Sequence, residues 1–492
     1  MRTKWLIAPM FFVGLGTASI HSPVAAAESS SQNDTAQHIA AVESCLPPPI
    51  VVKGEAKSCT TLAARMAVLH VPGVSIAVIH NGAIEWARGY GVRQRGGDPV
   101  TVDTLFQAGS ISKPLAAMAA LRLVQEGKLS LDTDVNASLT SWKIPPSTAA
   151  PGAVVTLREL LTHTAGMTVH GFPGYAAGAP VPTLVQVLNG EAPANTRPIR
   201  VDTVPGSEWR YSGGGYTVMQ QLVLDTAKEP FPQLLHDTVL APIGMTASSY
   251  QQPLPASQLS HAALPYNFDG TPVAGGPHTY PEMAAAGLWT TPSDLCRYIL
   301  EVQGSLGGKA NHVLSQSMTQ QMLTAGKGNW GLGLELGGSS GDPWFSHGGV
   351  NEGYVSLFVG FDHDGNGAAV MTNAPGGGPL TADVMSAIAV AYGWPDWGPA
   401  VYSVVKVDPA VLARYVGTYQ LTPTFSVTIT LEGDQLMTQA TNQEKFPLYP
   451  ESQTKFFLKV VKSEVEFFPD DKGQVSYLII HQGGQDHKGV RK

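Results

Sequence analysis

Ser110 and Lys113 are the pair of residues whose types and spacing could do chemistry. Ser110 follows a short extended stretch, 104–107, and the turn-permitting Gly109, while Pro114 belongs in the first turn of a helix. Residues three apart share one face of a helix, so the lysine would project beside the serine, and the first helical N–H groups would face an oxyanion formed there. A nucleophile next to a base and an electrophile site predicts acyl transfer through Ser110.

The spacing alone is not specific, because two further Ser-x-x-Lys matches occur, at Ser403/Lys406 and Ser452/Lys455. Both lie in a tail that is rich in predicted strands, where no helix would present the two side chains together. The strand, turn and helix around Ser110 therefore favour this first match.

Two further side chains stand beside glycine runs that would let backbone approach a substrate. Tyr211 precedes Gly213 and carries a titratable phenol, although a buried aromatic residue is the plainer interpretation of a tyrosine in that place. His347 precedes Gly348 and Gly349, and a surface histidine without function is the alternative there.

Composition narrows the class of protein. The 492 residues suggest two or three domains, and 43% hydrophobic with 14% charged residues indicates a well-cored globular protein. The net charge of −8, without a basic cluster, argues against nucleic acid as a partner. No H-E-x-x-H or C-x-x-C motif is present. We therefore expect neither a catalytic metal nor a cofactor. The expected partner is a small-molecule or short-peptide substrate of the acyl transfer at Ser110.

The N-terminal segment 1–27 has the form of a secretory signal, with Arg2 and Lys4 before an apolar run and small residues at its end. This predicts export to a periplasm or beyond, without a permanent membrane span. Residues 28–69 form an N-terminal extension, whose polar part, 28–40, we expect to be disordered. An oxidising compartment would allow a disulfide between Cys45 and Cys59, and Cys296 is interpreted as a buried thiol.

Local patterns predict an α+β catalytic domain over 70–395, in which helices flank an antiparallel sheet. An Asn-Gly turn predicts a hairpin over 74–90, and 170–203 is interpreted as an irregular excursion. Further helices are predicted at 110–127, 217–227 and 381–391, and capping residues predict two more that begin after Thr156 and Thr291. Strands are predicted at 330–336, 344–347, 353–361 and 368–372. Short, regularly spaced strands in 396–492 predict a small all-β barrel or sandwich.

With Ser110/Lys113, Tyr211-Ser-Gly213 and His347-Gly-Gly349 in this order, the chain resembles the penicillin-recognising serine hydrolases. Class C β-lactamases, serine D-Ala-D-Ala carboxypeptidases, D-aminopeptidases and family VIII esterases are the most similar members. The resemblance covers about 70–395, and the tail resembles the lipocalin-like C-terminal domains of some of these peptidases. It implies a β-lactamase/transpeptidase-like fold.

The resemblance also implies roles. Ser110 would be the acylated nucleophile, Lys113 its base, and Tyr211 a proton shuttle to the leaving group and the deacylating water. His347 stands where these enzymes carry Lys or His. The N–H groups of Ser110 and Val350 would form the oxyanion hole. The backbone of three glycines would lie against the substrate: Gly213, Gly348 and Gly349. Many relatives have Asn at the position of Gly213.

The predicted function is an exported serine hydrolase that acts through an acyl-enzyme on D-amino-acid peptides or amides, or on small esters. One alternative is a weak β-lactamase. Another is a penicillin-binding sensor or scaffold that is acylated without turnover. The C-terminal domain would be an interaction module that could form a homo-oligomer.

Overall fold

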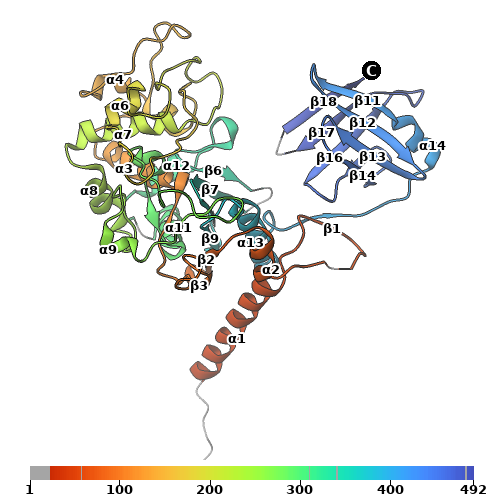
Figure 1. The fold of residues 1–492 in the computed structure, drawn as a ribbon, viewed down its shortest axis with the longest axis horizontal. Coiled ribbons are helices and arrows are strands. Elements are labelled where there is room, and N and C mark those ends of the chain that lie inside the picture. The colour runs from red at the N-terminus through yellow and green to blue at the C-terminus, as the bar shows by residue number, and fades with distance from the viewer. Residues whose placement is uncertain (1–22, 57, 310, 339–341, 483–484) are drawn as a thin grey trace, which may run out of the picture.

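The computed structural model describes residues 23–56, 58–309, 311–338, 342–482 and 485–492, which form two bodies and a projecting helix (Figure 1). Residues 1–22, which hold most of the expected signal segment, lie outside the described residues. Within the described part of the chain, no helix combines the length and the apolar character needed to cross a bilayer.

The larger body is built on a six-stranded antiparallel sheet in the order β3-β2-β9-β8-β7-β6. The predicted hairpin is confirmed as β2 and β3, joined at Asn81 and Gly82. The central strands are buried along almost their whole length, which explains their nearly continuous apolar sequences. The strands are β2 (Gly73–His80), β3 (Ala83–Gly91), β6 (Glu335–Gly337), β7 (Trp344–Asn351), β8 (Tyr354–Phe361) and β9 (Gly367–Thr372).

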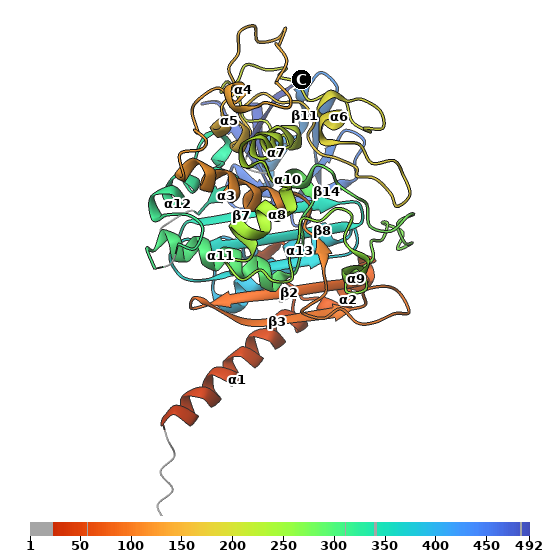
Figure 2. The same cartoon turned by 90° about the vertical axis from the view of Figure 1, so that its left-hand side faces the viewer.

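Helices cover both faces of this sheet. Helix α11 (Pro292–Leu306) packs on one face, onto which Figure 2 looks, and α13 (Gly377–Tyr392) packs on the other. Helices α1 (Pro23–Ser44) and α2 (Leu62–Val68) join α13. The expectation of disorder over 28–40 is therefore wrong. The side chains of Ile39 and Val42 are buried in one cluster with α13, and this tertiary contact outweighs the low apolar content of the segment.

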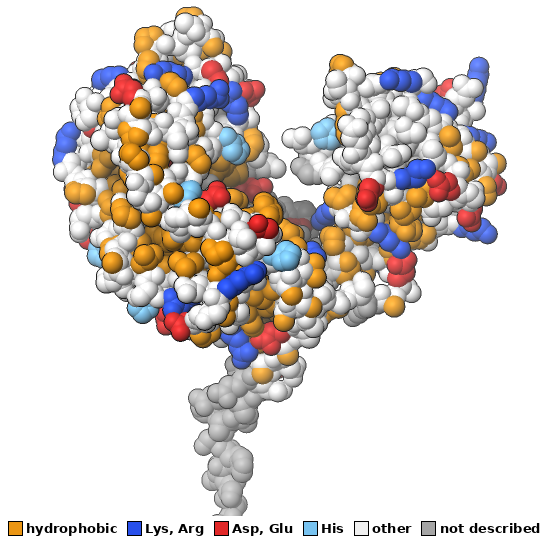
Figure 3. Space-filling model, in the orientation of Figure 1, with side chains coloured by type: hydrophobic (Ala, Val, Ile, Leu, Met, Phe, Trp, Pro, Cys, Tyr) orange, Lys and Arg blue, Asp and Glu red, His pale blue; other side chains and the backbone are white. Residues whose placement is uncertain are grey.

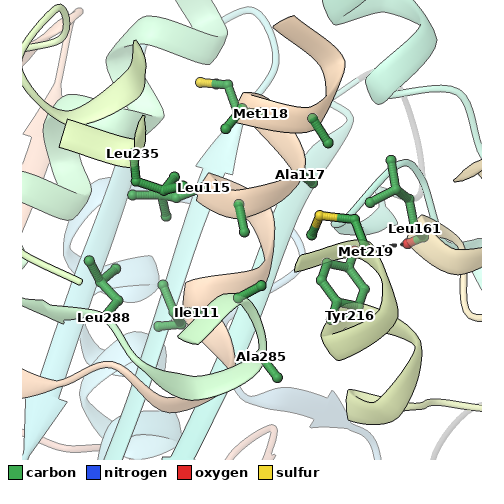
Figure 4. Close-up of a cluster of buried hydrophobic side chains, with 14 of the residues drawn as sticks. Ile111, Leu115, Ala117, Met118, Leu161, Tyr216, Met219, Leu235, Ala285 and Leu288 are labelled. Carbon is green, nitrogen blue, oxygen red and sulfur yellow. Dashed lines mark hydrogen bonds between the residues drawn. The ribbon is translucent and has the colours of Figure 1, made fainter. Parts of the chain in front are cut away.

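A second group of helices positions the site. Helix α3 (Ser112–Gln125) lies at the centre of this group, and most of its side chains are buried. A helix that is apolar on all sides belongs inside the protein. Figure 4 shows side chains of α3 beside Tyr216 and Met219 of α7 (Gly213–Ala227) and Ala285 of α10 (Met283–Ala286). The hydroxyl of Tyr216 donates to Leu161 O over 3.0 Å.

Shorter elements complete this body. The excursion predicted to be irregular over 170–203 holds one capped helix, α6, whose capping box is formed by Thr183 and Gln186. The strand predicted over 330–336 begins only at Glu335. The other elements are α4 (Val135–Ser138), α5 (Leu157–Leu161), α6 (Leu184–Asn189), α8 (Phe231–Leu235), η2 (His236–Leu240), α9 (Ala256–Leu259), α12 (Gln316–Met322), η3 (Lys327–Asn329), β4 (Phe106–Gln107) and β5 (Trp289–Thr290).

The smaller body is a closed barrel of eight antiparallel strands, which confirms an all-β C-terminal part and makes it a barrel instead of a sandwich. Helix α14 (Pro409–Leu412) and the turn η4 (Ala413–Tyr415) precede it. Its strands are β11 (Gly417–Thr422), β12 (Phe425–Glu432), β13 (Gln435–Ala440), β14 (Lys445–Pro450), β15 (Lys455–Phe457), β16 (Ser463–Pro469), β17 (Val475–Gln482) and β18 (Gln485–Arg491).

The two bodies are joined by a parallel ribbon of β1 (Ile50–Val52) and β10 (Ala400–Tyr402). The ring of Tyr402 stacks on Phe457 of the barrel at 4.2 Å between centroids. A disulfide between Cys45 and Cys59 ties the chain leading into β1, and Cys296 is a buried free thiol. In the view of Figure 3 a gap separates the bodies above this junction.

Candidate active site

Ser110 and Lys113 meet where a strand turns into a helix. Strand β4 ends at Gln107, the turn η1 (Gly109–Ile111) follows, and α3 begins at Ser112. Gly109 has φ +54°, a left-handed conformation that glycine adopts without steric cost. The Nζ atom of Lys113 donates to Ser110 Oγ over 2.8 Å and to Ala285 O over 2.8 Å. A partly exposed hydroxyl therefore lies in hydrogen-bond contact with a buried amine.

The surroundings of Lys113 favour its neutral form. The side chain is buried, and burial lowers its pKa to about 7 because a charged ammonium loses its hydration there. Its two hydrogen-bond partners are uncharged oxygen atoms, and the rings of Tyr211 and Tyr216 lie 5.0 and 5.7 Å from Nζ. At neutral pH a large fraction of the lysine can therefore accept the Ser110 proton.

Tyr211 approaches the same hydroxyl from the segment that leads into α7. Its phenol interacts with the Ser110 side chain, and burial raises the pKa of the phenol well above the ordinary value. Tyr211 is therefore protonated at neutral pH, so it can pass a proton between Ser110 and a leaving group but does not stand as a ready phenolate base.

His347 reaches the site from β7. Its Nδ1 donates to Gly348 O over 2.6 Å, while the buried Nε2 makes no hydrogen bond with any residue that the structure describes. Burial first, and then the charge of Lys113, lower the pKa of the imidazole to about 3. His347 is therefore neutral, and the neutral form of Lys113 is favoured by burial, not by a second positive charge.

Strand β7 lies very close to the turn of Ser110. A Cβ placed on Gly349 would stand 1.8 Å from Ala108 O, and one on Gly109 would stand 2.5 Å from Val350 N. Strand β6 pairs with residues 344–346 of β7 and with no later residue of that strand. On this side, the edge of β7 from His347 onward therefore contacts the turn of Ser110 instead of another described strand. The contact sets the backbone of Val350 beside Ser110, as an oxyanion site at their N–H groups requires.

The three glycines differ in their surroundings. Gly348 is exposed, with Ser356 O 3.9 Å from its Cβ position, whereas Gly349 is enclosed. At Gly213, a Cβ would lie 3.0 Å from both His170 O and the ring of Phe172. The loop 170–172 therefore occupies the space that a larger side chain, such as the Asn of many relatives, would need.

His163 is a site residue that sequence reasoning missed. Its ring lies 4.2 Å from that of Tyr211, its Nδ1 accepts from Ser212 N over 3.2 Å, and its backbone O accepts from Arg210 N over 2.8 Å. The imidazole is buried and its pKa is lowered by burial, so it is neutral. His163 thus holds three successive residues around Tyr211. The sequence shows a His-Thr-Ala-Gly stretch after a capped helix, but nothing in it identifies the partner.

Trp330 packs against the site, and Glu282 is a buried carboxyl group near Tyr175 and Tyr280. The ring of Trp330 lies 5.9 Å from that of Tyr211 and 5.4 Å from that of His347, and these two rings lie 6.3 Å from each other, so the three rings pack as a triangle. Glu282, next to α10, is fully buried, and burial raises its pKa to about 8. Neither of its carboxyl oxygens bonds with another described residue, so the group is mostly protonated at neutral pH. The sequence therefore identified Tyr211 and His347 but not the tryptophan that packs against both of them.

The other two Ser-x-x-Lys matches do no comparable chemistry. Ser452 and Lys455 lie in a barrel turn, where the backbone N–H of Lys455 donates to Ser452 Oγ and its amine pairs with Glu464 at 2.6 Å. Ser403 and Lys406 lie in the exposed linker after β10. No group of three metal-binding side chains gathers within the described part of the chain.

Comparison with known proteins gives the class. Residues 60–392 match the family model of β-lactamases, which covers the sheet, its helices and the whole site. The chain therefore belongs to the β-lactamase family, which includes penicillin-binding proteins and serine hydrolases. Residues 403–490, the barrel, match a model described as a domain of unknown function.

Individual relatives agree with this class. The chain is 23% identical to penicillin-binding protein 4* of Bacillus subtilis over 434 residues, 80% of this chain and 89% of that protein. Its fold is similar to an octameric penicillin-binding protein homologue from Pyrococcus abyssi, with TM-score 0.58 and 22% identity over 87% and 98% of the two chains. The fold is also similar to that of a D-alanine carboxypeptidase from Burkholderia cenocepacia, with TM-score 0.55 and 20% sequence identity. The match covers 74% of this chain and 99% of that chain.

Proposed function

We propose that this protein is a serine hydrolase that works through an acyl-enzyme on Ser110. The observation that carries the proposal is the 2.8 Å hydrogen bond from the buried amine of Lys113 to Ser110 Oγ, together with the pKa of about 7 that burial gives this amine. A nucleophile in contact with a base that is largely neutral at working pH is the arrangement that covalent catalysis needs.

The reaction follows from the four side chains. Lys113 takes the Ser110 proton as Oγ attacks the carbonyl carbon, and the N–H groups of Ser110 and Val350 stabilise the oxyanion. Tyr211, which is protonated and interacts with Ser110, gives its proton to the leaving group and regains one from Lys113. Water then attacks the acyl-enzyme, with Lys113 and Tyr211 again moving the proton.

The substrates we propose are amides or peptides of D-amino acids, or small esters. Gly213 supports this choice, because the loop 170–172 fills the place of an amide side chain that would hold an acylamino group. One relative is named a penicillin-binding protein, and this name favours substrates with D-configured residues over unrelated esters. Export is part of the same proposal, supported by the form of 1–27 and by the Cys45–Cys59 disulfide.

The test compares steady turnover of a nitrophenyl ester, a D-alanine anilide and a chromogenic cephalosporin. We expect turnover of the first two and slow or no hydrolysis of the third. Mass spectrometry after treatment with a fluorophosphonate should map a single adduct to Ser110, and Ser110→Ala should lose both activities. Activity that survives in Ser110→Ala would refute the proposal. A stoichiometric adduct without turnover would instead favour a penicillin-binding sensor.

A further inference from the structure

The C-terminal barrel is filled at one end only. There the ring of Tyr415 stacks on Phe467 at 4.3 Å between centroids, and Phe456 packs against both rings. The hydroxyl of Tyr419 donates to Tyr415 O over 2.8 Å, which fixes η4 across this end. An eight-stranded barrel is wide enough either to be filled by side chains or to hold one small ligand. In this barrel, side chains fill one end.

The other end encloses a cavity of about 680 Å³. This volume lies within the range of about 300–1,000 Å³ that is typical of sites for small organic ligands. Its wall is mainly apolar and comes from strands all round the barrel: Leu421, Phe425, Val427, Ala440, Phe446, Leu458, Val465 and Ile480. Several of these side chains, among them Phe425, Phe446 and Ile480, are only half-buried because they face this empty space.

We propose that this cavity is a binding site for a small lipophile, a molecule with an apolar chain or ring body and an uncharged polar head. A ligand with an apolar body that fills this cavity gains contacts with the apolar wall that the empty cavity lacks. The exposed Val460 and Val461 stand at the rim and extend the apolar surface to the entrance.

The polar groups of the wall indicate the head. Thr438 and Ser463 are buried on the wall, and neither hydroxyl makes a hydrogen bond with any residue that the structure describes. Hydroxyls can bond an alcohol, ester or amide. Charges at the rim are of both signs. Asp486 is engaged by His481 at 2.6 Å, and Lys488 lies 4.0 Å from the centroid of the Tyr477 ring. The rim therefore offers no single-sign cluster for an ionic head.

The site does not depend on the proposed hydrolase activity, because none of its residues belongs to the catalytic body. Binding is measured on the full chain with the neutral fluorescent probe N-phenyl-1-naphthylamine. We expect a saturable rise in fluorescence with one site per chain and a micromolar dissociation constant. Decan-1-ol should displace the probe, and decanoate should displace it less well. The Ser110→Ala chain should bind the probe equally.

A matched pair of variants locates the site. Ala440 lines the cavity, so Ala440→Phe would fill it and should weaken probe binding by about tenfold or more. Ala413 is exposed on η4 at the filled end, and Ala413→Phe should bind as the unchanged chain does. If circular dichroism shows that Ala440→Phe does not fold, Ala440→Leu replaces it, and we expect a smaller loss of probe affinity. The proposed site would be refuted if the unchanged chain did not bind the probe, or if Ala440→Phe and Ala413→Phe bound it equally well. Equal displacement by decanoate would overturn the uncharged head.

Discussion

Lys113 decides at which pH the candidate site can work. Its amine is enclosed by two tyrosine rings, hydrogen-bonded to Ser110 and Ala285, and separated from water. No carboxylate of the described residues forms an ion pair with this amine, so the cost of burying a charge is not compensated there. A lysine in this setting loses its proton at a pH where an exposed lysine keeps it, which makes it a base.

The first prediction concerns pH. Only the neutral amine can accept the Ser110 proton, and the neutral fraction grows as pH rises through the pKa of Lys113, about 7. Ester kcat/KM should therefore increase about tenfold per pH unit below pH 7 and level off above it. His347, with a pKa of about 3, and Tyr211, with a raised pKa, do not titrate in this range. A rate that keeps rising to pH 10 would show that the amine is not desolvated.

The second prediction concerns His163, which we expect to position Tyr211 without touching the substrate. His163→Ala removes both the ring beside Tyr211 and the acceptor for Ser212 N–H, and should lower ester kcat by about 100-fold, as small misplacements of a catalytic group can. His163→Phe keeps a ring beside Tyr211, so its loss of ester kcat should be smaller. The inflection near pH 7 should stay, because Lys113 is unchanged.

His170 gives the control for this variant. Its exposed ring lies 4.9 Å from Tyr211, but no hydrogen bond from it to the segment 210–212 is present among the described residues. His170→Phe should therefore change ester kcat by less than about threefold. Equal losses in the His163 and His170 variants would contradict a positioning role for His163.

At the scale of elements, the site exists because β7 passes the turn between β4 and α3 with almost no space between the backbones. Two glycines make this possible. Gly109 turns the chain with a positive φ, and Gly349 leaves Ala108 O room to approach. The N–H groups of Ser110 and Val350, which we propose as oxyanion donors, are therefore held by main-chain packing, which is more rigid than a loop.

The third prediction tests this packing. Gly349→Ala would place Cβ 1.8 Å from Ala108 O, so β7 must move away from Ser110. We expect a loss of ester kcat of about 100-fold or more. Gly348→Ala is the matched control, since its Cβ would meet nothing nearer than Ser356 O at 3.9 Å, and it should retain near-normal kcat. The reverse order of effects would place the oxyanion site elsewhere.

The sequence predicted those elements whose signals are local. The Asn81-Gly82 turn fixes a hairpin, and Gly109 with Pro114 fixes a turn before a helix, because each depends on the φ values of a few residues. It failed for 28–40, where the decisive contacts of Ile39 and Val42 are with α13, more than 300 residues away. Likewise, His163 and Glu282 look ordinary in sequence. Only the fold shows that His163 faces Tyr211 and that the carboxyl group of Glu282 has no hydrogen-bond partner among the described residues.

At the scale of the whole molecule, the chain contains separate hydrophobic cores. The sheet and its helices share two large clusters, the barrel has its own, and a small fourth cluster at the β1–β10 ribbon joins them: Ile50, Val52, Tyr402 and Phe457. A few further side-chain contacts strengthen this junction, such as Lys459 with Glu55 at 2.6 Å. Bodies with separate cores and a small interface are expected to unfold independently.

The fourth prediction follows from these separate cores. Phe467 is buried in the filled end of the barrel, stacked on Tyr415, so Phe467→Ala should destabilise the barrel by about 3–5 kcal/mol. Calorimetry should then show one of two unfolding transitions moved to lower temperature. Ester activity, which depends on the other body, should be unchanged at temperatures below both transitions. Phe358→Ala, in the sheet behind the site, is the counterpart: it should lower the other transition and the temperature at which activity is lost. A single transition that moves equally in both variants would mean that the barrel and the catalytic body fold as one cooperative unit.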